Sequence, residues 1–305
     1  MRNTFVKEIT NLAEKNKKIV ILAGDIGYKL FDNFNKKFPN RFYNCGVAEA
    51  NMTTVAAGLA LKGFIPITYT IATFNVYKTV EQIKIDLCYP NLGSLIVGVG
   101  SGLGYADLGS THHSTEDIGV LRSIPNLNIV CPADSIELKE LLPQLIKNKK
   151  PTYFRLGKKG EANLYTKPPK VKIGKGNIVY KGSKICIIAT GNIIVNANEA
   201  VKRLRKKKIF PSLISMHTIK PLDTLLLKKV FKEFKYIVVL EEHSSIGGLS
   251  SAISEYYLNN QSNTNFLSLN TGKDFIVKSG KQQSAFKKLK ISPEDIEKKI
   301  MNFIK

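Results

Sequence analysis

Short runs of apolar residues, many of them β-branched, alternate along the chain with longer stretches in which apolar residues recur at helical spacing. In the first half, this pattern predicts buried strands for residues 19–23, 65–69, 95–99, 128–130 and 152–156. Around and between them it predicts helices for residues 3–17, 49–61, 79–88 and 135–147. Such alternation is typical of an α/β fold built on a parallel sheet.

The second half repeats the pattern after a change in composition. Residues 157–184 are rich in Gly, Lys and Pro and contain the pair Pro168-Pro169, which is typical of a connecting segment. Beyond it, strands are predicted for residues 185–189, 211–215, 236–240 and 266–269, and helices for 194–207, 223–234 and 247–258. We therefore expect two α/β domains, residues 1–160 and 184–305, joined by a linker over residues 161–183.

Length and cysteine usage narrow the class of protein. The 305 residues suffice for two domains whose cores need no disulfide or metal. The four cysteines (Cys45, Cys88, Cys131 and Cys186) are far apart in sequence and form no CxxC or Cys/His cluster. A reducing cytoplasm therefore fits best. The N-terminus lacks the apolar run of a signal peptide and every apolar stretch is short, so we expect no membrane segment.

The formal charge of +22 raises the question of nucleic-acid binding. The lysines are scattered along the whole chain, and no aromatic residues interleave with them as they do in a base-stacking platform. This distribution indicates a bias in composition, and no nucleic-acid partner is expected. A positive field would still attract anionic substrates.

Three features place polar or aromatic residues beside predicted strands, and each has an ordinary structural explanation. Glu49 begins the helix 49–61, where a carboxylate complements the helix dipole. Phe74 and Tyr77 are three residues apart, a spacing that is common in core packing. The segment 98–104 has a loose GxGxG pattern but does not open a helix, so a Rossmann-type nucleotide site is not expected.

The order of these features along the chain is more specific than any one of them. Gly-Val-Ala-Glu at 46–49 precedes Thr-Phe at 73–74, the glycine-rich loop, Thr-His-His at 111–113, Glu-Asp at 116–117 and Tyr-Phe-Arg-Leu-Gly at 153–157. This set resembles the pyrimidine-binding domain of transketolases. Thr-Ile-Lys-Pro-Leu-Asp at 218–223, Glu-Glu-His at 241–243 and Gly-Gly-Leu at 247–249 resemble the transketolase C-terminal domain. The likeness is closest to the C-terminal subunit of split transketolases.

The resemblance implies a fold class and an activity. The fold would be two doubly wound α/β domains, a pyrimidine-type thiamine-diphosphate-binding fold followed by a transketolase C-terminal domain. The activity would be transfer of a two-carbon ketol unit between sugars. Three alternatives stay open: a subunit like deoxyxylulose-phosphate synthase, one like the beta subunit of a 2-oxo-acid dehydrogenase, and a non-catalytic assembly subunit.

The resemblance also implies which residues face the cofactor. In the family a buried glutamate hydrogen-bonds atom N1′ of the aminopyrimidine ring, and Glu49 matches that residue. Phe74 and Tyr77 match the aromatic residues that stack on the ring, while a third aromatic position is taken here by Val80. Asp25 matches an acidic residue near the cofactor.

For the substrate, the resemblance implies a sugar or sugar phosphate held by residues of the first domain. His112, which also counts as catalytic, matches a histidine that faces the substrate, and Arg155 and Arg2 match arginines that hold its phosphate. Two positions depart from the family pattern, because Gly100 replaces a histidine and Leu108 replaces an aspartate, for which the adjacent Asp107 could substitute. We therefore expect a preference for a modified sugar.

The family's ligands for the diphosphate and its metal are missing. Gly24-Asp25-Ile26 is not a Gly-Asp-Gly motif, and no Asn-Asn pair follows at the expected distance. The resemblance thus implies that this chain itself ligates no metal. A separate N-terminal subunit would supply the diphosphate and Mg²⁺ site, in a heterotetramer that also associates through both domains of this chain.

Overall fold

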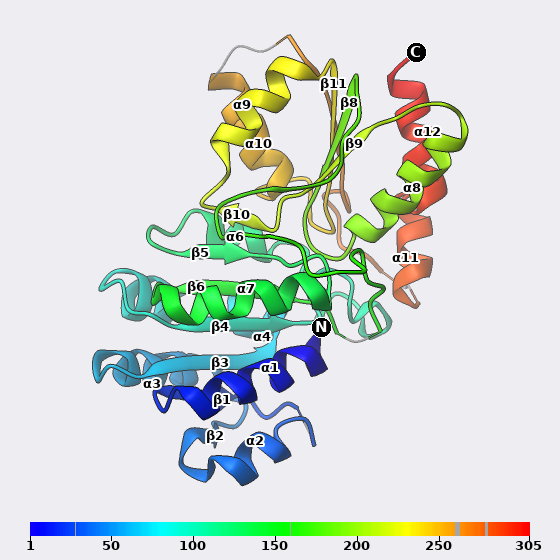
Figure 1. Cartoon of the computed structure of the whole chain (residues 1–305). Coiled ribbons are helices and arrows are strands. Elements are labelled where there is room, and N and C mark those ends of the chain that lie inside the picture. Colours follow the sequence, from blue (N-terminus) through cyan, green and yellow to red (C-terminus); the bar gives the residue numbers. More distant parts are fainter. Residues whose placement is uncertain (28, 159, 260–262, 278–279) are drawn as a thin grey trace.

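The computed structural model describes residues 1–27, 29–158, 160–259, 263–277 and 280–305, and within these ranges it contains two α/β domains. The first sheet has seven strands in the order β10-β5-β6-β4-β3-β1-β2, and the second has five in the order β12-β11-β8-β9-β7. Each sheet carries helices on both faces (Figure 1). The predicted fold class, two doubly wound α/β domains, is confirmed.

The strands of the first domain form a parallel sheet. They are β1 (Ile19–Ala23), β2 (Phe42–Asn44), β3 (Ile65–Ile71), β4 (Leu95–Val99), β5 (Asn128–Val130) and β6 (Thr152–Leu156). Four of these coincide with predicted strands, because short, fully buried apolar runs mark central strands of parallel sheets. All the carboxyl ends consequently lie along one edge of the sheet.

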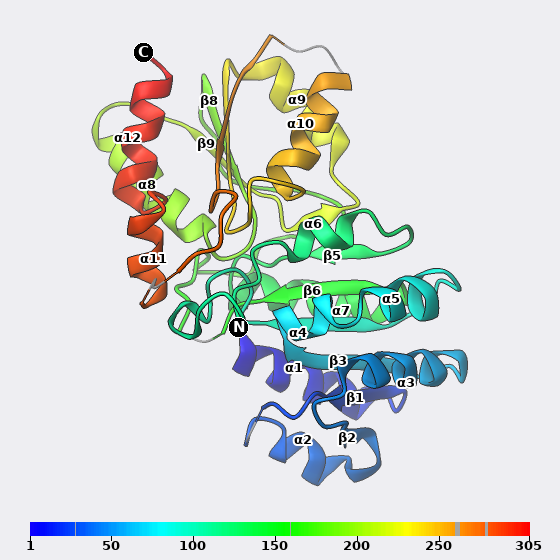
Figure 2. The ribbon, with the colours of Figure 1, turned by 180° about the vertical axis from the view of Figure 1, so that it is seen from behind.

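Helices cover both faces of this sheet, as the two opposite views show (Figure 1 and Figure 2). One face carries α1 (Arg2–Lys15) and α7 (Ser135–Asn148). The other carries α3 (Glu49–Leu61), α4 (Ala72–Tyr77), α5 (Val80–Gln82) and α6 (Asp117–Arg122), while α2 (Asp32–Lys37) lies beside β2. The helix predicted for residues 79–88 is only partly regular, since Ile83–Cys88 forms a π-helix in which Tyr89 N donates to Lys84 O at 2.9 Å.

The second domain is a smaller sheet of mainly parallel strands. It contains β7 (Asn177–Tyr180), β8 (Ile185–Ala189), β9 (Ser212–Ser215), β11 (Tyr236–Leu240) and β12 (Asn265–Leu269). Helices α8 (Ile194–Lys206), α11 (Gln282–Lys288) and α12 (Pro293–Phe303) lie on one side, with α9 (Thr224–Glu233) and α10 (Leu249–Asn259) on the other. Of the described helices, none is long and apolar enough to cross a membrane.

Two connections differ from a simple pair of domains joined by a linker. Strand β7 falls inside the segment 161–183 expected as linker, and it pairs antiparallel with β9 at the edge of the second sheet. Strand β10 (Thr218–Lys220) follows β9 but pairs antiparallel with β5 of the first sheet. The two domains therefore share a strand, which ties them firmly together.

Candidate functional site

A buried carboxylate lies at the carboxyl edge of the first sheet. Glu49 is the first residue of α3 and is only 2% exposed. The end of β1 approaches it closely, because a β-carbon added at Gly24 would lie 3.6 Å from Glu49 Cγ. Burial of a charge is costly unless the charge is paired, and Lys78 Nζ lies 3.1 Å from Glu49 Oε2.

A second polar group in this position is unpaired. Thr70, near the end of β3, is buried, and its Oγ1 has no hydrogen-bond partner among the residues that the structure describes. A β-carbon at Gly24 would lie 3.2 Å from this oxygen, so Thr70 and Glu49 flank the same glycine. Because buried polar groups are nearly always hydrogen-bonded in native proteins, this pocket suits a ligand with hydrogen-bonding groups.

A row of rings continues from Glu49 along the sheet edge. Lys78 Nζ lies 5.0 Å from the centre of the Phe74 ring, and the Phe74 ring lies 5.3 Å from that of His112. The next ring is Tyr105, whose centre is 6.1 Å from His112. Thus the structure brings together three predicted site residues, Glu49, Phe74 and His112, on one continuous surface.

Tyr77 is placed differently from Phe74, although both belong to α4. Its hydroxyl donates to Glu116 Oε2 at 2.8 Å. Burial, together with the nearby carboxylates of Asp117 and Glu116, raises the pKa of Tyr77 far above its ordinary value. The ring is therefore held as a neutral phenol, anchored to the loop before α6, and it lines a pocket of about 240 Å³.

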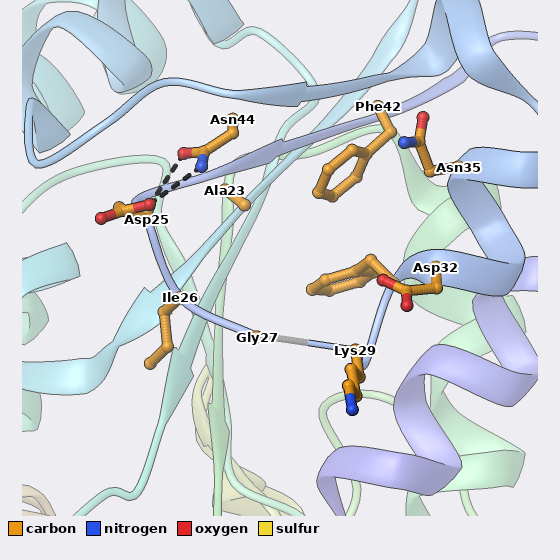
Figure 3. Close-up of a pocket in the computed structure, with 10 residues that line it drawn as sticks. Ala23, Asp25, Ile26, Gly27, Lys29, Asp32, Asn35, Phe42 and Asn44 are labelled. Atoms are coloured by element: carbon orange, nitrogen blue, oxygen red, sulfur yellow. Dashed lines mark hydrogen bonds between the residues drawn. The ribbon is translucent and has the colours of Figure 1, made fainter.

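Asp25 lies just beyond the end of β1 in a left-handed backbone conformation, with φ +49°. Its Oδ1 accepts a hydrogen bond from Asn44 Nδ2 at 2.9 Å, and Asp25 N donates to Asn44 Oδ1 at 3.1 Å (Figure 3). These two residues lie at one end of a pocket of about 370 Å³, between β1, β2 and α2. The pair fixes the loop that follows β1, next to Gly24 and hence close to Glu49.

Arg155, expected to hold a sugar phosphate, is 4% exposed and is engaged inside the protein. Its Nε donates to Asp117 Oδ2 at 2.8 Å, and its Nη2 donates to Ser114 O at 2.9 Å and to Glu242 O of the second domain at 3.0 Å. Burial alone would raise the pKa of Asp117, but the charge and hydrogen bond of Arg155 outweigh it and lower that pKa. The arginine thus links the two domains, and its binding of phosphate stays a prediction.

The remaining predicted substrate residues lie around Tyr105. Arg2 begins α1, and its positive charge partly offsets the burial that raises the pKa of Tyr105. Asp107 is exposed, with Oδ1 3.9 Å from Lys158 Nζ. Leu108 is 50% exposed. Asp107 and Leu108 therefore lie on the surface of the loop, and neither is enclosed in the row that runs from Glu49 to His112.

Sequence reasoning missed Lys78, Thr70 and Tyr105. Lys78 is four residues after Phe74, so its helical spacing placed it on the same side, but nothing in the sequence indicated contact with Glu49 across β3. Tyr105 lies in the glycine-rich loop, where only the glycines attracted attention. In the part of the chain that is described, no group of three or more His, Cys, Asp or Glu side chains could hold a metal ion.

Comparison with known proteins agrees with this architecture. Residues 1–161 match the family "Transketolase, pyrimidine binding domain", and residues 174–296 match "Transketolase, C-terminal domain". One of the two subunits of the apulose-4-phosphate transketolase of Phocaeicola vulgatus is 33% identical over 306 residues, which cover 100% of this chain and 97% of that protein.

Two further relatives have the same extent. The putative transketolase C-terminal section of Methanocaldococcus jannaschii is 33% identical over 308 residues, covering 100% of this chain and 96% of that one. A solved structure described as a split gene transketolase, inactive beta4 tetramer, is 29% identical and superposes with a TM-score of 0.89 over 99% of this chain and 96% of that one. The chain thus spans nearly the full length of these proteins.

Proposed function

Because this chain belongs to the transketolase family, we propose that it is the C-terminal subunit of a two-chain enzyme that transfers a two-carbon ketol unit between sugars. The observation that carries this proposal is the buried carboxylate of Glu49 at the start of α3, beside the unpaired Thr70 hydroxyl and the Phe74 ring. A carboxylate that served only as a helix cap would not need such burial.

The residues at this edge fit the aminopyrimidine half of thiamine diphosphate. Glu49 offers a carboxylate to a ring nitrogen, Thr70 offers an unpaired hydroxyl, and Phe74 offers an aromatic surface. Gly24 leaves the space between them free, since any side chain there would press on Thr70. When bound, this cofactor supplies a thiazolium carbon that acts as a nucleophile toward a ketose carbonyl.

The chain's own residues would have distinct tasks in that reaction. Glu49 holds the proton at the pyrimidine N1′ atom, Phe74 and Tyr77 orient the ring, and Asp25 supports the loop beside it. His112, half-buried next to Phe74, faces the sugar and can exchange a proton with its hydroxyl or carbonyl oxygen. Arg2, Arg155 and Asp107 are the residues we propose to hold the rest of the sugar.

We propose that the ligands for the diphosphate and Mg²⁺ lie on a separate partner chain, because this sequence lacks the Gly-Asp-Gly and Asn-Asn motifs. Two relatives are named as parts of a transketolase, and the beta-only tetramer of the split-gene relative is described as inactive. Both facts support activity only in a complex, for which we propose a heterotetramer.

All four cysteines are free thiols, which supports a reducing compartment such as the cytoplasm.

The test is Glu49→Gln in the purified two-chain complex. An uncharged amide cannot share the N1′ proton in the same way, so we expect kcat to fall about 10²-fold or more, while the melting temperature changes little. Glu140→Gln, an exposed glutamate of α7, serves as the matched control and should keep full activity. Near wild-type turnover by Glu49→Gln would show that the carboxylate has no catalytic role, as in a non-catalytic assembly protein.

A further inference from the structure

The end of β4 is covered by an aromatic ring. Gly100, the residue after β4, has φ +70°, and a β-carbon added to it would lie 2.0 Å from Tyr105 Cε2 and 2.3 Å from Tyr105 Cδ2. Only glycine tolerates both the backbone conformation and this contact. The Tyr105 ring therefore occupies the space that any side chain at position 100 would need.

Hydrogen bonds hold the loop that carries this ring. Gly102 and Ser114 exchange backbone hydrogen bonds, with Gly102 N to Ser114 O at 3.0 Å and Ser114 N to Gly102 O at 2.9 Å. Leu103 N donates to the Glu242 carboxylate at 2.7 Å, which fastens the loop to the second domain. Tyr105 itself is 7% exposed. The ring is thus a built part of the wall.

Tyr105 lies between the proposed sugar site and the Arg155 side of the molecule. On one side its ring faces His112, and on the other Lys158 Nζ lies 4.1 Å from the ring centre. Lys158 also lines the cavity at Arg155, which holds only about 40 Å³ and is bordered by the carboxylates of Glu161 and Glu242. By that measure it has room for a few water molecules, and its acidic border disfavours an anion.

We propose that Tyr105 is the end wall of the sugar site and selects sugars whose end distant from the reacting carbons carries no phosphate. An apolar ring face, with Leu108 exposed nearby in the same loop, suits a short or deoxygenated end. A phosphate pressed against it would lose hydration without gaining a free counter-charge, because Arg155 is paired with Asp117 and Lys158 lies near Asp107. This inference rests on the proposed function and names its substrate class.

The test compares D-ribose with D-ribose 5-phosphate as acceptors for the two-chain complex, with hydroxypyruvate as the ketol donor. The wild type should favour D-ribose, measured as kcat/KM. Tyr105→Leu, which keeps an apolar side chain but shortens it, should raise the ratio for the phosphorylated over the free sugar about tenfold, equal to about 1.4 kcal/mol. Tyr105→Phe should keep the wild-type ratio, because the ring forms the wall.

Tyr180→Leu is the matched control, since Tyr180 lies on β7 of the second domain with Arg205 over its ring at 4.6 Å. It should leave the ratio unchanged. A wild-type preference for D-ribose 5-phosphate, or an equal ratio in Tyr105→Leu, would overturn the proposal. Calorimetric binding of D-ribose 5-phosphate separates the two hypotheses: if no acceptor is converted at all, the proposed function fails, while tighter binding by Tyr105→Leu than by wild type still supports the wall.

Discussion

At the scale of single residues, the state of Glu49 depends on Lys78. The ammonium of Lys78 lies 3.1 Å from the carboxylate and 5.0 Å from the centre of the Phe74 ring, so it occupies the space between the two groups proposed to hold the pyrimidine. The lysine side chain is 49% exposed, which leaves it a path to solvent. An incoming ring must therefore exchange an ion pair for a hydrogen bond.

Lys78→Met should strengthen thiamine diphosphate binding to the two-chain complex. A pair with one exposed partner contributes roughly 0.2–1 kcal/mol, so the expected fall in Kd is about two- to fivefold. The wild-type Kd should also decrease as salt rises, and the variant's dependence on salt should be weaker. Fluorescence titration at two salt concentrations measures both effects, with Lys62→Met as an exposed control. Weaker binding by Lys78→Met would mean that the ammonium contacts the cofactor instead of competing with it.

At the scale of elements, the loop between β4 and α6 is held by the second domain. The carboxylate of Glu242, which follows β11, accepts hydrogen bonds from Leu103 N at 2.7 Å and Gln282 Nε2 at 2.8 Å, and Ser244 N donates to Thr115 O at 2.6 Å. Burial raises the pKa of Glu242 to about 7, although these hydrogen bonds and Arg155 act in the opposite direction. The C-terminal domain thus shapes the site without supplying its proposed catalytic residues.

The raised pKa of Glu242 predicts a pH dependence of stability. The folded protein holds this proton more tightly than the unfolded chain, whose carboxyl has a pKa near 4.5, so the contribution is complete below 4.5 and is lost as pH rises to about 7. Between pH 5 and 8, the wild type should lose on the order of 2 kcal/mol relative to Glu242→Gln, which stays neutral.

Urea unfolding of both proteins at pH 5, 6.5 and 8 measures this difference. The comparison with the variant is necessary because buried His217, whose pKa burial lowers to about 4, has the opposite effect and destabilises the fold as pH falls below 6.5. Equal pH profiles for wild type and Glu242→Gln would show that Glu242 is ionised in the fold throughout this range.

At the scale of the whole molecule, apolar side chains remain uncovered on the face formed by α3 and the π-helix. Val47, Leu61, Ile85 and Tyr89 are all exposed there, and Thr54 Oγ1 on α3 donates to Asp86 Oδ2 at 2.8 Å, which holds the two helices together. Contiguous apolar surface on a soluble protein usually marks an interface. This face begins at the helix that carries Glu49, so a protein partner docked there would also lie close to the proposed cofactor site.

The isolated chain should bind thiamine diphosphate and Mg²⁺ poorly, and its affinity should rise at least about tenfold on addition of the diphosphate-binding partner, a change of about 1.4 kcal/mol. Calorimetry with each preparation measures the affinities, and native mass spectrometry of the chain alone reports its self-association. Tight, metal-dependent binding by the chain alone would contradict the division of the site between two subunits.

Much of the architecture was determined by the sequence itself. The strands at 19–23, 95–99, 128–130, 152–156, 185–189 and 236–240 and the helix at 49–61 lie where the apolar pattern placed them, because buried strands and helices leave short-range periodicities. The ordered motifs likewise identified the family, and Glu49, Phe74 and His112 as neighbours. The boundary near β7 was harder to predict, since an edge strand of alternating burial has a weak pattern.

Only the tertiary structure decided which side chains meet. The pairing of Glu49 with Lys78, the contact of Tyr105 with Gly100 and the enclosure of Arg155 by Asp117 and Glu242 each join segments that are distant in sequence or lie on opposite sides of a turn. Such contacts depend on the order and register of parallel strands and on how the second domain docks. Local periodicity carries no information on either, because it reports only which face of its own element a residue occupies.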